Sequence, residues 1–254
     1  MEYGTVANCF YTHCGRESMV ITRFTLEKTG MEDTQFPFDY SRMYNAGYVG
    51  RNQEEVRKHV RELAAKGVPA PSSTPALYAV GCHCLCTETV VDVYGDETSG
   101  EAEYVLLVEN EKSVFVGLGS DHTDRFLEQT DIPRSKQICP NMIATSVWAL
   151  EDVADHWDDI VMRSYVQKNG SETLYQEGLL GAIFSPRQLM EFVKDRAGTG
   201  IDNSILFSGT LSLKTGDFLY GEGFRAELID PILKRKLTLS YTVRTLSSLN
   251  PGGD

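Results

Sequence analysis

Three acidic residues in the middle of the chain have the types and spacing of a metal site. Glu101 and Glu103 open one strand-like run, and Asp121 closes the next. Residues two apart on a strand point to the same face, and a polar turn from Glu109 to Lys112 would return the second run beside the first. Converging carboxylates are costly to bury without a cation. Oxygen ligands favour a hard divalent ion such as Mg²⁺, Mn²⁺ or Ca²⁺; an edge strand with exposed glutamates is the alternative.

A histidine and a glutamate three residues apart lie on a predicted helix. Asn52 and Glu55 have the spacing of a capping box, apolar residues then recur at helical intervals, and Gly67 is a natural stop. His59 and Glu62 are therefore neighbours on one helix face. A carboxylate that orients an imidazole is the arrangement of a general base. A solvated helix face is the alternative interpretation.

The six cysteines raise the question of a second kind of metal site. Cys82, Cys84 and Cys86 surround His83, and on a strand the three thiols would share one face. Zinc sites more often use paired cysteines in loops, and no second pair follows here. We therefore expect these thiols to be buried and free of zinc, as small hydrophobic side chains.

Length and charge restrict the classes of protein that fit. The chain has 254 residues, enough for one large domain or one domain with a small appendage. A net charge of −12 argues against nucleic acid or anionic membranes as partners. The sequence lacks both an apolar run long enough for a membrane span and a signal-peptide start. These features predict a cytoplasmic protein with reduced cysteines.

The elements that must position the acidic residues are mostly strands. Apart from the helix that carries His59, the sequence predicts helices over 146–157 and 186–196, the second marked by Ser185 and Pro186 at its start. It predicts an irregular run from 122 to 144 and a loop over 30–37. Strands are predicted at 18–29, 76–80, 87–94, 160–166, 204–207, 224–229 and 237–243.

Several short motifs, taken in order, resemble those of the fumarylacetoacetate hydrolase (FAH) superfamily. The resemblance extends from about Gly47 to Val243. The matching segments are Gly50-Arg51-Asn52 with His59-Val60-Arg61-Glu62, Glu101-x-Glu103, Asp121, Ser135-Lys136 before Cys139-Pro140, Asn169-Gly170 with Gln176 and the helix from Pro186, and Ser208-Gly209-Thr210. No single motif is specific, but their shared order makes the resemblance meaningful.

The resemblance implies a fold, a domain division and an assembly. The fold would be α+β and mostly β, an FAH-like β-roll with flanking helices. Residues 1–46 would form a strand-containing N-terminal extension and residues 47–254 the catalytic domain. Members of this superfamily are commonly homodimers, so a homodimer is expected.

The resemblance also implies metal-dependent chemistry on a small oxo-carboxylate. Glu101, Glu103 and Asp121 would hold Mg²⁺ or Mn²⁺, with Ca²⁺ as a further possibility. The main expectation is a hydrolase that cleaves a C–C or related bond with water activated by His59 and Glu62. The alternatives are a decarboxylase or hydratase on the same scaffold, and a member that binds metal and ligand without turnover.

Four further residues receive roles from the same resemblance, each with a simpler alternative. Lys136 would be a catalytic cation, or else a solvated loop lysine. Arg125 would neutralise a substrate carboxylate, or else form a structural ion pair. Gly209 and Thr210 would offer a backbone N–H and a hydroxyl to the substrate, or else form an ordinary turn.

The sequence also departs from the usual motifs of the superfamily. The interval from Asn52 to His59 is longer than usual, and that from Glu103 to Asp121 is shorter. Val80-Gly81 stands where a lysine-proline pair is common. The usual S-A-R-D-x-Q segment appears as residues 123–128, TDRFLE. The resemblance therefore names no particular substrate.

Overall fold

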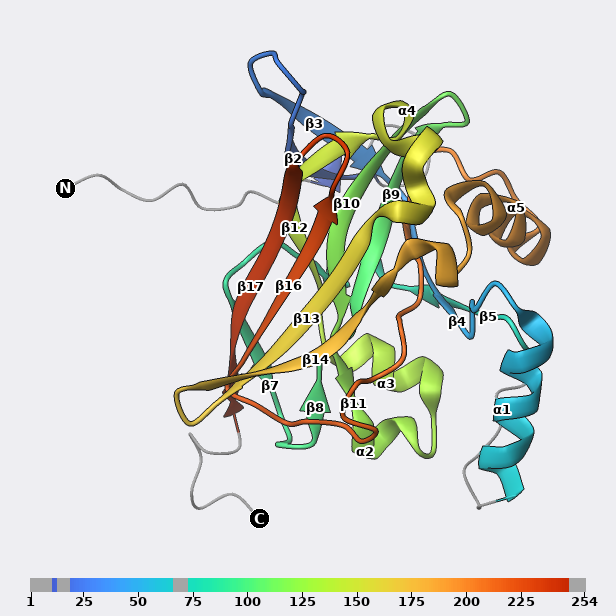
Figure 1. The fold of residues 1–254 in the computed structure, drawn as a ribbon, viewed down its shortest axis with the longest axis vertical. Coiled ribbons are helices and arrows are strands. Elements are labelled where there is room, and N and C mark those ends of the chain that lie inside the picture. The colour runs from blue at the N-terminus through green and yellow to red at the C-terminus, as the bar shows by residue number, and fades with distance from the viewer. Residues whose placement is uncertain (1–10, 13–18, 66–72, 247–254) are drawn as a thin grey trace.

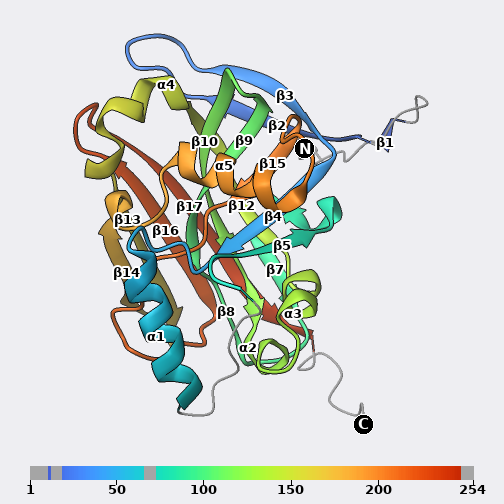
Figure 2. The same ribbon diagram turned by 90° about the vertical axis from the view of Figure 1, so that its right-hand side faces the viewer.

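A computed structural model describes residues 11–12, 19–65 and 73–246 of the chain (Figure 1). Strands are the commonest element among these residues, and they form two large sheets packed face to face with helices at their edges (Figures 1 and 2). This arrangement confirms the expected fold class, α+β and mostly β, with a curled FAH-like sheet.

The larger sheet has ten strands and contains the hairpin with the acidic residues. Its main order is β1-β2-β12-β10-β9-β15-β4-β5, with β3 paired to β2 and β6 paired to β12. Its strands are β1 (Tyr11–Thr12), β2 (Met19–Leu26), β3 (Thr34–Tyr40), β4 (Arg42–Gly47), β5 (Ala76–Val80), β6 (Leu85–Cys86), β9 (Ala102–Asn110), β10 (Ser113–Asp121), β12 (Asn141–Ala149) and β15 (Ser204–Phe207).

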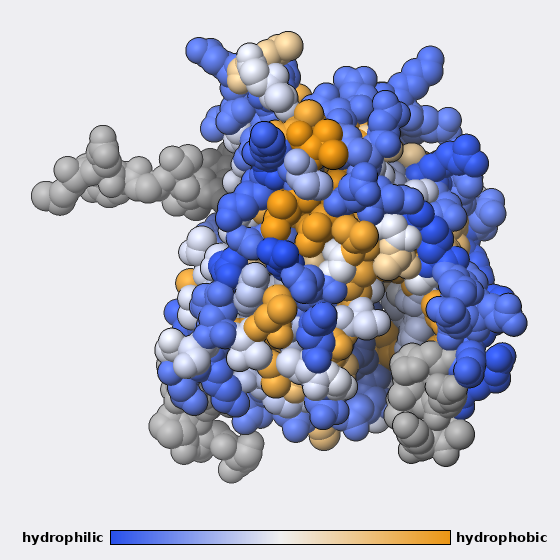
Figure 3. All heavy atoms as spheres, in the orientation of Figure 1, coloured by the Kyte–Doolittle hydropathy of each residue, from blue (hydrophilic) through white to orange (hydrophobic). Residues whose placement is uncertain are grey.

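The smaller sheet has five strands in the order β14-β13-β16-β17-β7, and a two-stranded ladder joins β11 to β8. These strands are β7 (Val90–Val93), β8 (Thr98–Ser99), β11 (Thr123–Asp124), β13 (Val161–Lys168), β14 (Ser171–Leu179), β16 (Gly223–Asp230) and β17 (Arg235–Thr245). Figure 3 shows the face over this sheet: polar side chains cover most of it, and hydrophobic ones gather along its middle.

The helices lie around the sheets. They are α1 (Gln53–Ala65), α2 (Arg125–Glu128), α3 (Ile132–Ile138), α4 (Leu150–Val153) and α5 (Pro186–Ala197), with 3₁₀ turns η1 (Cys82–Cys84), η2 (Ala154–Asp159) and η3 (Leu180–Ala182). In Figure 2 both α1 and α5 lie on the side that faces the viewer. No helix in the described ranges is long and apolar enough to cross a membrane.

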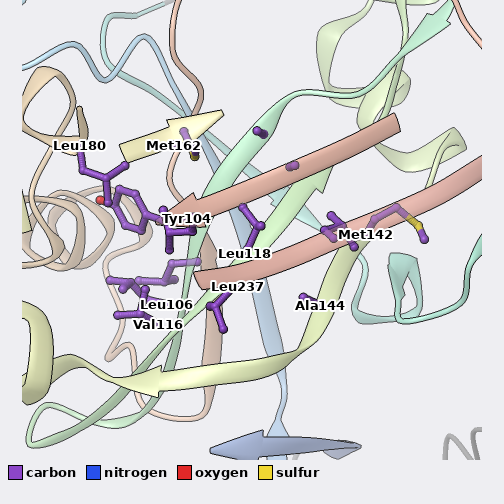
Figure 4. Close-up of a cluster of buried hydrophobic side chains, with 14 of the residues drawn as sticks. Tyr104, Leu106, Val116, Leu118, Met142, Ala144, Met162, Leu180 and Leu237 are labelled. Atoms are coloured by element: carbon purple, nitrogen blue, oxygen red, sulfur yellow. The ribbon is translucent and has the colours of Figure 1, made fainter. Parts of the chain in front are cut away.

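Strand β9 is the centre of the core because both of its faces are buried. Tyr104 and Leu106 belong to the core between the two sheets (Figure 4). Val105 and Leu107 point the other way, into a second core that includes Phe24. Alternation along a strand explains this division. The first residues of β9, next to Glu101, are therefore packed on both faces.

Several sequence expectations are confirmed in the structure. Asn52 accepts a hydrogen bond from the Glu55 N–H at 3.3 Å, as an N-cap should. Ser185 and Gln188 form a complete capping box at the start of α5. Asn169 and Gly170, with φ of 51° and 74°, form the tight turn between β13 and β14.

Other expectations are wrong, and local patterns explain most of them. The predicted helix over 146–157 is strand β12 as far as Ala149, because Val147 and Trp148 face opposite cores, and only its remainder is helical, as α4 and η2. The run after Asp121 contains β11, α2, α3 and the first part of β12, with α2 and α3 capped by Asp124 and Asp131. The loop expected over 30–37 ends at Thr34, where β3 begins.

The cysteine segment also differs from its prediction. Cys82 to Cys84 form a 3₁₀ turn, so the three thiols do not alternate along one strand. Cys84 is buried, while Cys82 and Cys86 are half-buried. The proposed division at residue 46 stays a prediction, although β2, β3 and β4 belong to the same sheet as β9.

Candidate metal centre

Three carboxylates meet at one end of the β9–β10 hairpin. Glu103 faces Gly119 across the ladder, and the Asp121 N–H donates to the Glu101 carbonyl at 3.1 Å. One carboxylate oxygen from each of Glu101, Glu103 and Asp121 lies within 4.8 Å of the other two. Glu103 and Asp121 are each only 1% exposed. The hairpin register therefore produces the convergence that the spacing predicts.

Lys136 supplies the first positive charge at this site. Its ammonium forms an ion pair with the Asp121 carboxylate, and its side chain is buried. The cap at Asp131 starts α3 so that Lys136 falls on the inner side of the helix. Burial alone would lower the pKa of Lys136, but the charges of Asp121 and Glu101 outweigh it, and the pKa is raised. Lys136 is therefore a fixed cation at neutral pH.

Arg125 supplies the second positive charge, from the start of α2. Its Nη2 lies 3.1 Å from Glu101 Oε1, and its Nη1 donates to Glu128 Oε2 at 2.7 Å. Its Nε donates to Ser99 Oγ at 2.7 Å, and the Phe218 ring lies over the guanidinium, 4.2 Å from the ring centroid to Cζ. Burial opposes the charge of Arg125, but Glu101 and Glu128 outweigh burial and raise its pKa. The structural ion pair considered from sequence is present.

Glu103 differs from its two neighbours because no lysine or arginine among the described residues forms an ion pair with it. Within the described part of the chain, its hydrogen-bond partner is the Gly209 N–H, which donates to Glu103 Oε2 at 2.8 Å. Burial, followed by the charges of Asp121 and Glu101, raises the pKa of Glu103 well above its ordinary range. A buried carboxylate in this situation is stabilised by a cation. The donor set therefore fits a hard divalent ion such as magnesium.

Gly209 and Thr210 support the glutamates from a loop that follows β15. Gly209 has φ of 80°, and a Cβ there would lie 2.7 Å from Val49 Cγ2, so only glycine fits. The Thr210 hydroxyl donates to the Ala102 carbonyl at 2.7 Å. Gln176 completes this support, since its Oε1 accepts from the Ala102 N–H at 3.0 Å and its Nε2 donates to Thr210.

A buried hydrogen-bond network flanks Asp121, and the sequence analysis did not predict it. Its members are Thr98, Ser120, His122 and Tyr241. The Tyr241 hydroxyl lies 2.9 Å from both Ser120 Oγ and His122 Nδ1. His122 Nε2 lies 3.0 Å from Thr98 Oγ1. Burial, followed by the charge of Arg125, lowers the pKa of His122 to about 3, so this imidazole is neutral. Nothing local marks Tyr241, because it is distant from Asp121 in sequence.

The backbone of α1 carries His59 and Glu62, but their side chains lie outside the described part of the chain. Figure 1 shows α1 at the edge of the molecule. Among the described residues, one group of histidine, cysteine or acidic side chains is close enough to hold a metal. It consists of Glu101, Glu103 and Asp121 and includes no cysteine.

Together, the fold and the carboxylate group define a mostly-β protein of FAH-like architecture with a candidate site for a divalent metal. Residues 46–241 match the model of the family described as "Protein of unknown function (DUF2848)". The chain belongs to this family. No curated protein matches the sequence.

Solved structures similar to this protein share its fold at low sequence identity. The structure of 2-keto-3-deoxy-D-arabinonate dehydratase complexed with magnesium and 2,5-dioxopentanoate is 13% identical, with a TM-score of 0.59 over 92% of this chain and 95% of that chain. The crystal structure of Cg1458 with inhibitor is 14% identical, with a TM-score of 0.58 over 89% and 90% of the two chains. These likenesses support the expected FAH-like architecture.

Proposed function

We propose that this protein is a magnesium-dependent lyase that removes water from a small 2-oxo-carboxylate. The observation that carries the proposal is the buried Glu103, which lacks a cationic partner among the described residues and lies beside Glu101 and Asp121. A dehydratase of similar fold binds magnesium and a dioxo acid, which favours this alternative over the hydrolysis expected first from sequence. Manganese and calcium stay secondary candidates for the metal.

Glu101, Glu103 and Asp121 would hold the ion. When bound, the ion supplies a Lewis acid beside the oxo-carboxylate of the substrate. Lys136 would place its ammonium beside the negative charge that develops on the carbonyl oxygen, since its partner Asp121 keeps it in position. The Gly209 N–H donates to Glu103, and the Thr210 hydroxyl donates to the Ala102 carbonyl. A direct contact of either residue with the substrate stays a prediction.

The proton transfer would belong to α1. His59, oriented by Glu62, would take the proton from the carbon next to the carbonyl and donate it to the leaving hydroxyl group. Proton and hydroxyl then depart together as one water molecule. This role requires α1 to approach the carboxylates as a lid, which would also exclude bulk water.

The proposal is tested by separating dehydration from hydrolysis. Magnesium-loaded protein would be incubated with 2-oxo-3-deoxy sugar acids and, separately, with acylpyruvates, and the products followed by NMR. We expect water loss from the sugar acids and no product with Glu103→Gln protein. Cleavage of acylpyruvates without dehydration would favour the hydrolase instead. If magnesium binds and neither series is turned over, both the dehydratase and the hydrolase are refuted, and a binding protein is favoured.

A further inference from the structure

The charges at the candidate site balance with a divalent ion alone, so the oxo-carboxylate of the ligand already brings the total to one negative charge. Four carboxylates lie in ion-pair or metal-ligand positions, those of Glu101, Glu103, Asp121 and Glu128. Two cations oppose them, Arg125 and Lys136. The excess of two negative charges equals the charge of one divalent ion. Among the described residues at this site, no positive charge is left over for a carboxylate elsewhere on the ligand.

Glu128 is not in the metal-ligand group, but it pairs with Arg125. Without Glu128 the site would carry one more positive charge. It lies at the end of α2 and holds Arg125 Nη1 at 2.7 Å. Its side chain is 23% exposed, so it is accessible from solvent while its partner Arg125 is buried. After burial, the charge of Glu128 is the next cause that raises the pKa of Tyr48. The charge of Glu128 therefore acts on the Tyr48 hydroxyl as well as on Arg125.

Aromatic rings surround the same region. Phe218, which is 42% exposed, covers the Arg125 guanidinium. Tyr48 is 37% exposed and has a positive φ of 58°, which is uncommon for a residue other than glycine. The Tyr78 ring centroid lies 5.8 Å from Lys136 Nζ. Phe218 and Glu128 both contact the Arg125 guanidinium and are both partly exposed, so a ligand tail directed toward Arg125 would meet them.

We propose that the site selects ligands with one anionic group, the oxo-carboxylate, and an uncharged tail, and that Glu128 excludes a second carboxylate. The inference rests on the proposed function and specifies its substrate class. Glu128 acts in two ways: it neutralises Arg125, and it repels a negative tail directly. Arg125 Nη2 is buried against Glu101 Oε1 at 3.1 Å, and Nε and Nη1 donate to Ser99 and Glu128, so each guanidinium nitrogen already faces a partner in the protein.

The experiment compares two ligands that differ in one charge. Binding of 2-oxoglutarate and of its 5-methyl ester to magnesium-loaded protein would be measured by calorimetry at one ionic strength. The two share the oxo-carboxylate and differ mainly at the far carboxyl. We expect the ester to bind at least about tenfold more tightly, because placing like charges together is costly. This wild-type comparison requires no variant.

Two variants assign the preference to Glu128. Glu128→Gln removes its charge and keeps its shape, so we expect the ratio of the two affinities to fall by about tenfold. The matched control is Glu172→Gln, which also removes a glutamate paired to an arginine, Arg225, but on the β13–β14 hairpin. The control should leave the ratio unchanged, and thermal melts would show that both variants are folded.

The outcomes separate this inference from the proposed function. Tighter wild-type binding of 2-oxoglutarate than of the ester would overturn the inference and leave the oxo-acid function standing. An unchanged ratio in folded Glu128→Gln protein would overturn the role of Glu128. If neither ligand binds to protein that demonstrably holds magnesium, the oxo-acid function itself is refuted, and this inference with it.

Discussion

Among the single residues of the candidate centre, Glu103 depends most on a bound ion. Asp121 and Glu101 each contact a cation of the protein, Lys136 and Arg125 respectively. Among the residues that the structure describes, Glu103 instead accepts a hydrogen bond from the Gly209 N–H and forms no ion pair. The E-x-E spacing predicts that Glu103 faces the site, but it cannot predict this difference. The cations and Gly209 come from separate segments of the chain, so their distances depend on the whole fold.

Replacing this carboxylate tests the metal site directly. We expect Glu103→Gln to abolish the thermal stabilisation by magnesium, which for the native protein should reach about 2.7 kcal/mol at a hundredfold excess over Kd. The metal-free variant should be at least as stable as the native protein, because a buried charge is removed. Thermal melts with magnesium and with a chelator measure both effects. The variant Glu172→Gln should respond to magnesium as the native protein does.

The raised pKa of Glu103 predicts how metal stabilisation depends on pH. A carboxyl whose pKa is raised by folding binds its proton more tightly when folded. This contribution is fully present below the ordinary pKa of about 4.3 and is lost as pH rises through the raised pKa. The metal needs the ionised carboxylate, so protons compete with it. We expect the gain in Tm from magnesium to increase between about pH 5 and pH 8. A gain that is constant or falls over this range would contradict the assignment.

At the scale of elements, α2 and α3 show what the sequence could and could not predict. Asp124 and Asp131 are ordinary N-cap residues, so these starts were recognisable. The helices are four and seven residues long, too short to show a helical period of apolar residues. Longer elements such as α5, with its capping box, were predictable from local signals. Short helices held by contacts with their surroundings were not.

Helix α1 carries the prediction about catalysis. Once a substrate is identified, His59→Ala should lower kcat by about 10²–10⁴, the usual contribution of a positioned general base. Glu62→Gln should lower it less, because it keeps the shape and removes only the charge that supports the imidazole. Magnesium affinity, measured by calorimetry, should be nearly unchanged in both variants. A His59→Ala enzyme with native kcat would refute this role for α1.

At the scale of the whole molecule, the candidate centre lies where the two large sheets meet. Tyr241 belongs to β17 of the smaller sheet, whereas Ser120 belongs to β10 of the larger one. The Tyr241 hydroxyl bonds both Ser120 and His122, the residues on either side of Asp121. A Cβ on Gly100 would lie 2.4 Å from the same hydroxyl, so the space around it is full. The packing of the two sheets thus fixes Asp121.

Removing this hydroxyl should weaken the whole fold. Tyr241→Phe removes one buried hydrogen bond from each of Ser120 Oγ and His122 Nδ1, which should cost about 1–3 kcal/mol in the free energy of unfolding. Denaturant unfolding would measure the loss. The control is Tyr94→Phe, since Tyr94 is 71% exposed and should tolerate the change. Equal stability of the two variants would show that the network does not join the sheets energetically.

The fold class and the carboxylate group were predictable because each depends on local patterns in register. Continuous apolar runs defined β9 and β10, and the turn between them brought Glu103 to Asp121. The supports of the site were not predictable in the same way. Gln176, Gly209 and Tyr241 reach it through strand pairings and sheet packing that no local pattern specifies.

Glu103 and Asp121 belong to the β9–β10 hairpin, and Glu101 directly precedes it. This arrangement has a consequence for the order of folding. Contacts between β9 and β10 are close in sequence, so the loop that must close between Glu103 and Asp121 is short and its entropic cost is small. The ligands can therefore come together before β15 and Gly209 arrive from the distant part of the chain. An ion that binds at this early stage stabilises the transition state as well as the native protein. We therefore expect magnesium to increase the rate of folding, and not only to slow unfolding.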